Sequence, residues 1–281
     1  MGKNSITSNL TKEDVIADIR LTLSTDFNHE KCIVVVEGDD DLIFFRGKTK
    51  NNVELLQSYS GKIGVEEIVN ACDDNRIIGV RDKDYDGTSE DSRIFYYDYC
   101  CLEMMLIANA TAFSSFFYGY YKGSSNPLSV RDEILEDLKF LSLFRKLSSE
   151  KNWNINFSGL SLNKIIDDNC SKIKMDKLIE EIEKRNSEYS VMDSNHFSEI
   201  NSQIQEYSTI EALFSITQGH DFMDYFHKLC LIEAGPKWKA PKAGDLLVSL
   251  ICSYRPDELH ETNLYDSICD YEVSNELSIL V

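Results

Sequence analysis

The sequence predicts an α/β protein in which a small parallel sheet flanked by helices is followed by a mainly α-helical C-terminal extension. The run CIVVV (32–36) and the residues IIGV within RIIGV (76–80) are continuously apolar, and the segments between them are long enough for helices. This pattern is typical of parallel strands that are buried on both faces. Beyond about residue 111 the strand signals fade, and apolar residues over 134–147 recur with the period of a helix.

The elements of the sheet region are expected in a regular order. An amphipathic helix over 11–23 comes first, with Thr11 as its cap and Asp14 in the capping-box position. The chain then predicts, in order, the strand at 32–36, a helix beginning in DDDLIFF, a short strand at 53–56, a helix after Gly61 and the strand at 76–80. SRIFYYDY (92–99) predicts a further strand, which leads into a helix over CCLEMMLIANA (100–110).

A change of architecture is expected where the chain reaches KGSSNP (122–127), which has the composition of a linker. We therefore divide the chain into a domain over 1–115, which holds the sheet and the N-terminal helix, and a helical domain over 116–281.

The composition limits how this protein can meet other molecules. The chain has 281 residues, with 29 Lys and Arg against 48 Asp and Glu, and its net charge is -19. Such a charge opposes an extended, non-specific grip on nucleic acid phosphates, so any contact must be local, bridged by metal or assisted by a partner. The N-terminal residues lack the apolar core of a signal peptide, and no apolar run reaches the length of a membrane span. We expect a cytoplasmic protein that does not enter a membrane.

Acidic side chains follow both of the buried strands. Glu37 closes the first strand and Asp82 follows the later one, while Asp41 lies one helical turn past Glu37 and Asp84 lies two residues past Asp82. Because the carboxyl ends of parallel strands meet at one edge of a sheet, we expect these four carboxylates to converge. Two like charges 4 Å apart repel by about 4 kcal/mol at an effective dielectric of 20, so the cluster calls for protons or a cation.

A hard divalent cation is the simplest way to stabilise such a cluster. Oxygen ligands suit Mg²⁺ or Mn²⁺, and the cluster has no neighbouring His or Cys that would favour zinc. Two ions could activate water and stabilise the leaving oxygen of a phosphodiester. The expected metal ligands are Glu37, Asp82 and Asp84, and Asp41 is expected to help hold the ions as a catalytic carboxylate. Asp86 is either a further ligand or a turn residue.

Several residues near the cluster are candidates for contact with a phosphate or a nucleic acid. Gly38 would let the backbone approach a phosphate, and Lys83 would either contact a phosphate or offset the neighbouring carboxylates. Basic residues also surround Trp238, where they either grip a nucleic acid backbone or form an exposed loop. These are Lys237, Lys239 and Lys242.

The acidic pattern resembles the Toprim domain that topoisomerases, primases and OLD-type nucleases share. The matching residues are Glu37, Gly38, Asp41, Asp82 and Asp84, and the resemblance covers about residues 30–110. The order VRDKDYD, strand, YDYCCLEMML and helical tail is similar to the Toprim effectors that accompany an ABC-type ATPase in bacterial anti-phage defence, above all in the phage anti-restriction-induced system (PARIS).

This resemblance implies a Mg²⁺-dependent or Mn²⁺-dependent endonuclease toxin with two metal ions. It further implies that an ABC-type ATPase holds the nuclease in check, that tRNA is the substrate, and that the released effector forms a homodimer. In OLD-type relatives a further acidic residue and a lysine support the metals. Glu103 fits the acidic position, and one of the three lysines around Trp238 is a candidate for the other.

Other interpretations of the sequence remain open at this stage. The chain could be a non-catalytic docking or regulatory subunit of an ATPase complex, or a DNA-cleaving nuclease of the OLD type. A primase-like nucleotidyl transferase is disfavoured because no zinc motif accompanies the core. Residues 257–281 include seven acidic residues and no Lys or Arg, which predicts either a docking segment for a basic partner or a solvated helix.

Overall fold

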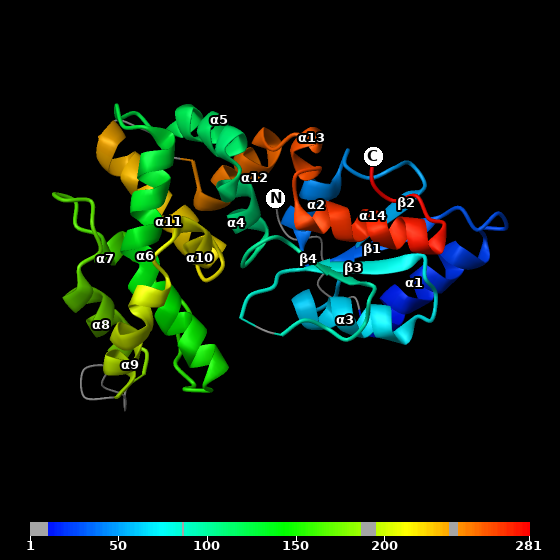
Figure 1. Ribbon diagram of the computed structural model, residues 1–281, viewed down its shortest axis with the longest axis horizontal. Coiled ribbons are helices and arrows are strands. Elements are labelled where there is room, and N and C mark those ends of the chain that lie inside the picture. Colours follow the sequence, from blue (N-terminus) through cyan, green and yellow to red (C-terminus); the bar gives the residue numbers. More distant parts are fainter. Residues whose placement is uncertain (1–10, 86, 187–194, 236–240) are drawn as a thin grey trace. The chain divides into compact units, whose positions relative to one another are not determined.

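The computed structural model of the chain describes residues 11–85, 87–186, 195–235 and 241–281. It divides the chain into two compact units (Figure 1). The first unit comprises the residues up to Lys83 together with Gly87–Asp98 and Tyr254–Val281. The second comprises Asp84–Asp86 and Tyr99–Ser253. The first carries a parallel sheet and the second is helical, so the predicted α/β class with a helical extension is confirmed.

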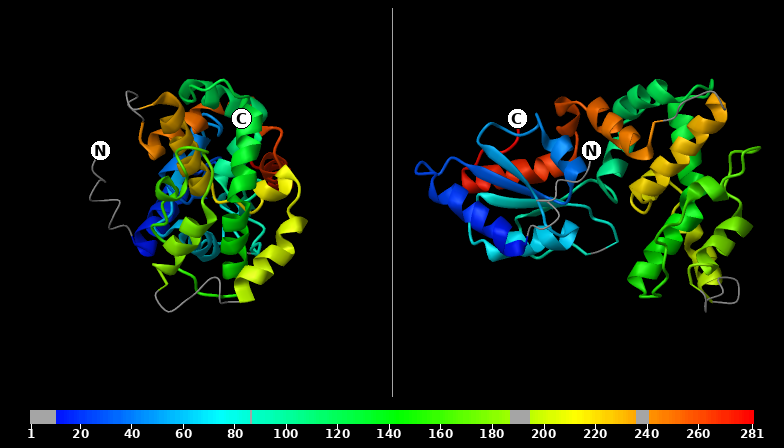
Figure 2. Two further views of the ribbon diagram at one scale, coloured as in Figure 1. Left: turned by 90° about the vertical axis from the view of Figure 1, so that its left-hand side faces the viewer. Right: turned by 180° about the vertical axis from the view of Figure 1, so that it is seen from behind.

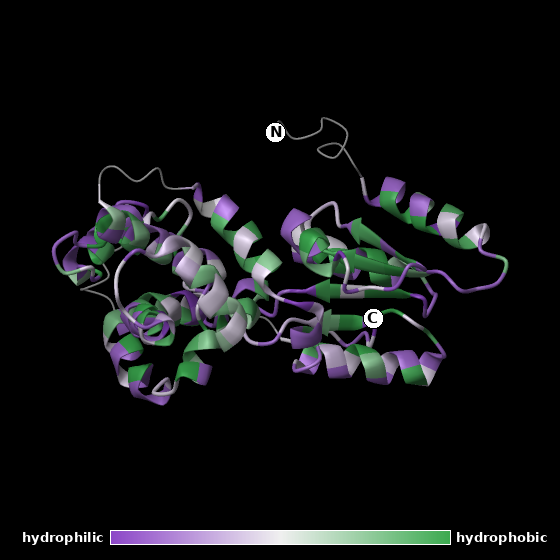
Figure 3. Ribbon diagram, turned by 90° about the horizontal axis from the view of Figure 1, so that it is seen from above, coloured by the Kyte–Doolittle hydropathy of each residue, from purple (hydrophilic) through white to green (hydrophobic). Residues whose placement is uncertain are grey.

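The sheet of the first unit has four parallel strands in the order β2-β1-β3-β4. The strands are β1 (Cys32–Val36), β2 (Val53–Gln57), β3 (Ile77–Arg81) and β4 (Ile94–Tyr96). Every residue of β1 and of β3 is buried, as the continuously apolar runs predicted. The strands also stand out as hydrophobic in Figure 3. Because β1 and β3 are neighbours, the residues that follow them leave the sheet side by side.

Helices cover both faces of this sheet (Figure 1). On one face, α1 (Lys12–Ser24) and α3 (Gly61–Ala71) form a core with apolar side chains of β1, β3 and β4. On the other lie α2 (Asp39–Phe45) and α14 (Asn263–Asn275). The predicted capping box of α1, formed by Thr11 and Asp14, is confirmed. Helix α3 packs so closely that a Cβ on Gly79 of β3 would lie 2.6 Å from the Cγ1 atom of Val65.

The last residues of the chain belong to the unit that carries the sheet, whereas the sequence placed residues 116–281 in the helical domain. Helix α14 lies beside the sheet (Figure 2), with the ring of Tyr271 5.5 Å from that of Phe95 in β4. The carboxylate of Asp98 accepts the backbone N–H groups of Asn263 and Leu264 at 3.0 Å. These contacts join segments far apart in the sequence, and no local pattern indicates them.

The second unit is built around the long helix α6 (Pro127–Glu150), which is capped by Asn126. The aromatic run 113–121 falls mostly on α5 (Ala110–Tyr120), and its phenylalanines, Phe113, Phe116 and Phe117, are buried in the core. The other helices are α4 (Leu102–Ala108), α7 (Leu162–Ile165), α8 (Met175–Glu183), α9 (Asn195–Gln203), α10 (Ile210–Phe214), α11 (Gly219–Ala234) and α12 (Ala243–Ser253). A 3₁₀ turn spans Ile204–Glu206 and the short α13 (Pro256–Leu259) belongs to the first unit. Within the described ranges, none of the helices combines the length and the apolar character needed to cross a bilayer.

Candidate active site

The first unit brings Glu37 and Asp82 together at the carboxyl edge of the sheet. Strand β1 ends at Val36 and β3 ends at Arg81, so each carboxylate residue directly follows a strand. The two strands are parallel neighbours, with Val36 opposite Val80. The Oε1 atom of Glu37 accepts the backbone N–H of Asp82 at 2.7 Å. The parallel pairing thus places these two acidic residues next to one another.

Arg81 holds the turn that carries Asp82. Its side chain is only 4% exposed, and its Nη1 atom donates to the carbonyl oxygen of Asp82 at 2.7 Å. Nε donates to Glu66 Oε1 at 3.0 Å, and the guanidinium lies 4.8 Å from the centre of the Tyr96 ring. Because a buried charge needs such partners, Arg81 fixes the backbone at the end of β3. Arg81 was not predicted from the sequence, although a charged side chain at the end of an otherwise apolar strand is a signal that could have indicated it.

Asp41 supports the turn that follows Glu37. Its Oδ2 atom accepts the backbone N–H of Gly38 at 2.9 Å, which caps the N-terminus of α2. Its Oδ1 atom accepts the hydroxyl of Tyr97 at 2.6 Å, and both side chains are buried. Burial, and then the negative charge of Asp41, raise the pKa of Tyr97 well above its ordinary value, so the phenol remains a donor. Tyr97 was not predicted from the sequence either, because its partner Asp41 lies 56 positions away.

The second acidic residue of the RDKD sequence belongs to the helical unit. The backbone of Asp84 has φ of 47°, a left-handed conformation that Asp tolerates better than most residues. Its N–H donates to the carbonyl of Cys100 at 2.7 Å, and its Oδ1 atom accepts from Nε2 of Gln218 at 3.2 Å. Because Asp84 and Asp82 lie in different units, the convergence of Asp84 with Glu37 stays a prediction. Lys83 is exposed, and Asp86 lies outside the described residues.

Glu103 contacts the start of another helix within the second unit. It is half-buried in α4, and a Cβ added at Gly219 would lie 2.5 Å from its Cβ atom. The N-terminus of α11 begins at Gly219, and a carboxylate is favoured at such a helix end. This contact gives Glu103 a structural partner.

The expected basic patch falls mostly outside the described part of the chain. Lys237 and Lys239, with Trp238 between them, lie outside the described residues. Lys242 is exposed, and its backbone N–H donates to Asp245 Oδ2 at 3.3 Å at the start of α12. The role of these lysines therefore stays a prediction.

The donor chemistry of the sheet edge suits a hard cation, because Glu37 and Asp82 offer carboxylate oxygens. Across the described ranges, no group of three or more His, Cys, Asp or Glu side chains is arranged to hold a metal ion. The first unit by itself therefore supplies two adjacent carboxylate residues, and a further ligand would have to come from beyond that pair.

Fold and site together define an α/β protein with an acidic pair at the carboxyl edge of a parallel sheet. Comparison with models of protein families gave no match, and comparison with curated proteins gave none either.

Proposed function

We propose that this chain is a metal-dependent nuclease of the Toprim type that hydrolyses phosphodiester bonds. The observation that carries the proposal is the pairing of Glu37 with Asp82 at the ends of two adjacent parallel strands. Open parallel sheets bind their ligands at this edge, where the chain leaves the strands. The buried side chain of Arg81 holds the turn after β3, and the hydrogen bond from Tyr97 to Asp41 holds the turn after β1. A preorganised site requires such support.

Glu37, Asp82 and Asp84 would hold Mg²⁺ or Mn²⁺, with Asp86 as a further candidate. Such an ion supplies an activated water and stabilises the leaving oxygen of a phosphodiester. Asp41 uses both carboxylate oxygens in hydrogen bonds, which supports a positioning role for it. The backbone at Gly38 and the side chain of Lys83 would contact a substrate phosphate.

The biological setting of the proposal rests on the sequence resemblance. We propose that the nuclease is the toxin effector of an anti-phage defence system, that an ABC-type ATPase controls it, that it acts on tRNA, and that it forms a homodimer when released. The net charge of -19 supports a contact with nucleic acid that is metal-bridged or partner-assisted, because an acidic surface repels phosphates.

The proposal is tested by incubating the purified chain with tRNA and with single-stranded and duplex DNA, in Mg²⁺, in Mn²⁺ or in EDTA. Wild type should cut at least one substrate only when a metal is present. Glu37→Gln should lower the rate by about a thousandfold, which corresponds to ~4 kcal/mol of transition-state stabilisation. Asp39→Asn, which removes a charge from an exposed residue of the same turn, should cleave like wild type. Equal cleavage by wild type and Glu37→Gln would exclude the proposed site.

A further inference from the structure

The helical unit contains a cavity of about 360 Å³, which lies within the range of about 300–1,000 Å³ typical of small-molecule sites. It is formed by the C-terminal part of α6, by the loop that follows this helix and by the residues around the start of α11. None of the residues proposed to hold metal lines this cavity, so it constitutes a separate feature of the second unit.

The walls of the cavity are polar, and besides Arg145 and His220 their polar side chains are neutral. Ser149, Asn152, Asn154 and Gln218 offer neutral hydroxyl and amide groups that can both donate and accept hydrogen bonds. Arg145 and His220 both contact the buried carboxylate of Asp221, which offsets part of their charge. The neutral groups suit a ligand that has several hydrogen-bond donors and acceptors.

Arg145 is paired with the buried carboxylate of Asp221. Nε lies 2.7 Å from Oδ2, and Nη2 donates to Oδ1 at 3.0 Å, which is a two-point contact. The exposed fractions of the two side chains are 12% and 3%. The pair neutralises the guanidinium and locks it against one wall of the cavity.

One wall is aromatic. Phe157 lines the cavity and meets the ring of Phe144 edge-on, with the centroids 5.2 Å apart. The guanidinium of Arg145 lies 4.9 Å from the centre of the Phe157 ring. These contacts hold the ring in place, and a fixed aromatic ring beside amide and hydroxyl groups is the combination that proteins use to stack and identify unpaired bases.

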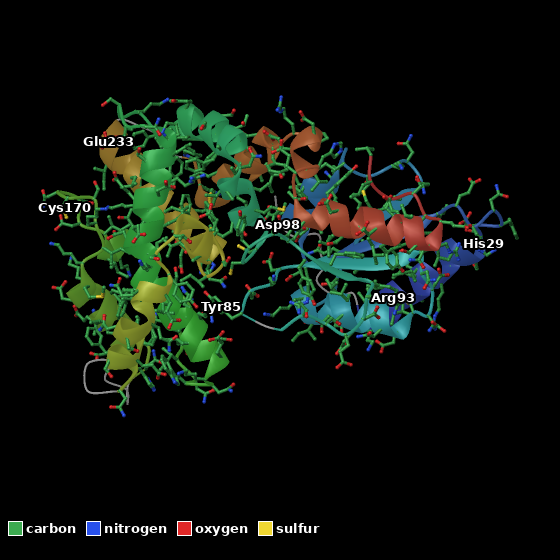
Figure 4. All side chains as sticks on the ribbon, viewed as in Figure 1. His29, Tyr85, Arg93, Asp98, Cys170 and Glu233 are labelled. Carbon is green, nitrogen blue, oxygen red and sulfur yellow. The ribbon has the colours of Figure 1, made fainter. Side chains whose placement is uncertain are left out.

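Gln218 connects this cavity to the acidic sequence after β3. Its side chain lines the cavity, and its Nε2 atom donates to Oδ1 of Asp84, one of the proposed metal ligands. Tyr85, labelled in Figure 4, also lines the cavity and donates its hydroxyl to the carbonyl of Ile216 at 2.8 Å. Tyr85, two residues after Lys83, thus forms part of the cavity wall.

We infer that this cavity binds one unpaired nucleobase of the nucleic acid substrate. The inference rests on the proposed nuclease function, and it assigns to that function the class of substrate: a strand with an exposed, unstacked base. A duplex offers no such base unless a nucleotide is flipped out, so single-stranded regions and loops are the substrates this cavity favours.

The test measures binding of mononucleotides to the full chain in EDTA, so that neither metal nor catalysis contributes. The probes are AMP, CMP, GMP and UMP, with ribose 5-phosphate as the control that lacks only the base. Ligand-observed NMR gives the affinities. At least one nucleotide should bind tenfold or more tightly than ribose 5-phosphate.

Two variants locate the binding. Ser149→Phe fills the cavity from an exposed position of α6, and Phe157→Leu removes the aromatic face while keeping an apolar side chain. Each should weaken nucleotide binding at least tenfold. The matched control is Ser129→Phe, an exposed serine at the other end of the same helix, which should bind like wild type.

Nucleotide affinity no greater than that for ribose 5-phosphate would overturn the inference, as would unchanged binding by both Ser149→Phe and Phe157→Leu. The same preparations, assayed for cleavage in Mg²⁺, separate this outcome from failure of the nuclease proposal. If the chain binds nucleotides in the cavity but cuts no substrate, the binding site is supported and the nuclease proposal fails. If wild type cuts RNA and Ser149→Phe binds nucleotides and cuts RNA like wild type, the nuclease proposal is supported and the base-binding site is refuted.

Discussion

The hydroxyl of Tyr97 provides a direct measure of how firmly the acidic turn after β1 is held. It donates to the carboxylate of Asp41 at 2.6 Å, and the exposed fractions of the two residues are 1% and 8%. Tyr97→Phe removes this one donor and keeps the ring, which packs 5.9 Å from that of Phe44. Hydrogen bonds to charged groups contribute about 1.5–3 kcal/mol, so the free energy of unfolding should fall by ~2 kcal/mol.

Urea unfolding followed by circular dichroism measures this loss. With a slope of about 1–3 kcal/mol per molar urea, a loss of ~2 kcal/mol lowers the midpoint by roughly 1 M. The control is Tyr118→Phe, which removes the same hydroxyl from a residue that is 67% exposed and should leave the free energy of unfolding within about 0.5 kcal/mol of wild type.

A second readout links this bond to the active site. Because Asp41 also holds the N–H of Gly38, loosening it should disturb the turn that carries Glu37, and nuclease activity should fall along with stability. If Tyr97→Phe unfolded at the same urea concentration as wild type, the carboxylate of Asp41 would not depend on this donor, and the argument that the pair fixes the turn would be refuted.

Two further predictions concern the helical unit. Asp221→Asn breaks the buried pair with Arg145 and should cost about 3–5 kcal/mol at neutral pH, measured by urea unfolding. Burial alone would raise the pKa of Asp221, but His220 and Arg145 hold it below its ordinary value of 3.8. Its contribution is therefore present above about pH 3.8 and is lost as the pH falls through the lowered pKa. Acid titration should accordingly show a smaller loss of stability in Asp221→Asn than in wild type, and parallel curves would contradict the assignment. Gly219→Ala places a Cβ 2.4 Å from the Cδ atom of Glu103 and should destabilise by about 1–3 kcal/mol. Adding Glu103→Ala, which removes the carboxylate and keeps Cβ, should restore part of the loss, and no recovery would show that the carboxylate of Glu103 is not the group that clashes.

The sequence predicted the sheet because its buried strands have an unmistakable composition. Residues 32–36 and 77–80 are apolar without interruption, which only a strand covered on both faces explains in a segment this short. Parallel pairing then follows from the helix-sized connections, and it places Glu37 beside Asp82 without any knowledge of side-chain conformation. The cap of α1 was equally predictable, because Thr11 and Asp14 interact across three residues.

The sequence could not predict the contacts that hold the site in place. Tyr97 meets Asp41 across 56 positions of the chain, and Gln218 meets Asp84 across 134. Asp98 accepts a hydrogen bond from the first residue of α14, 165 positions further along the chain. Contacts of this kind place the C-terminal residues in the unit that carries the sheet. Such partners depend on the assembled fold, and neither periodicity nor composition carries information about them.

Binding of Mn²⁺ tests most directly whether the carboxylates at the sheet edge hold a metal, because it needs neither substrate nor partner. Electron paramagnetic resonance should detect stoichiometric Mn²⁺ on wild type and on Asp39→Asn. The double variant Glu37→Gln with Asp82→Asn should lose the bound ion. Retention of Mn²⁺ by the double variant, with the stoichiometry of wild type, would contradict the account.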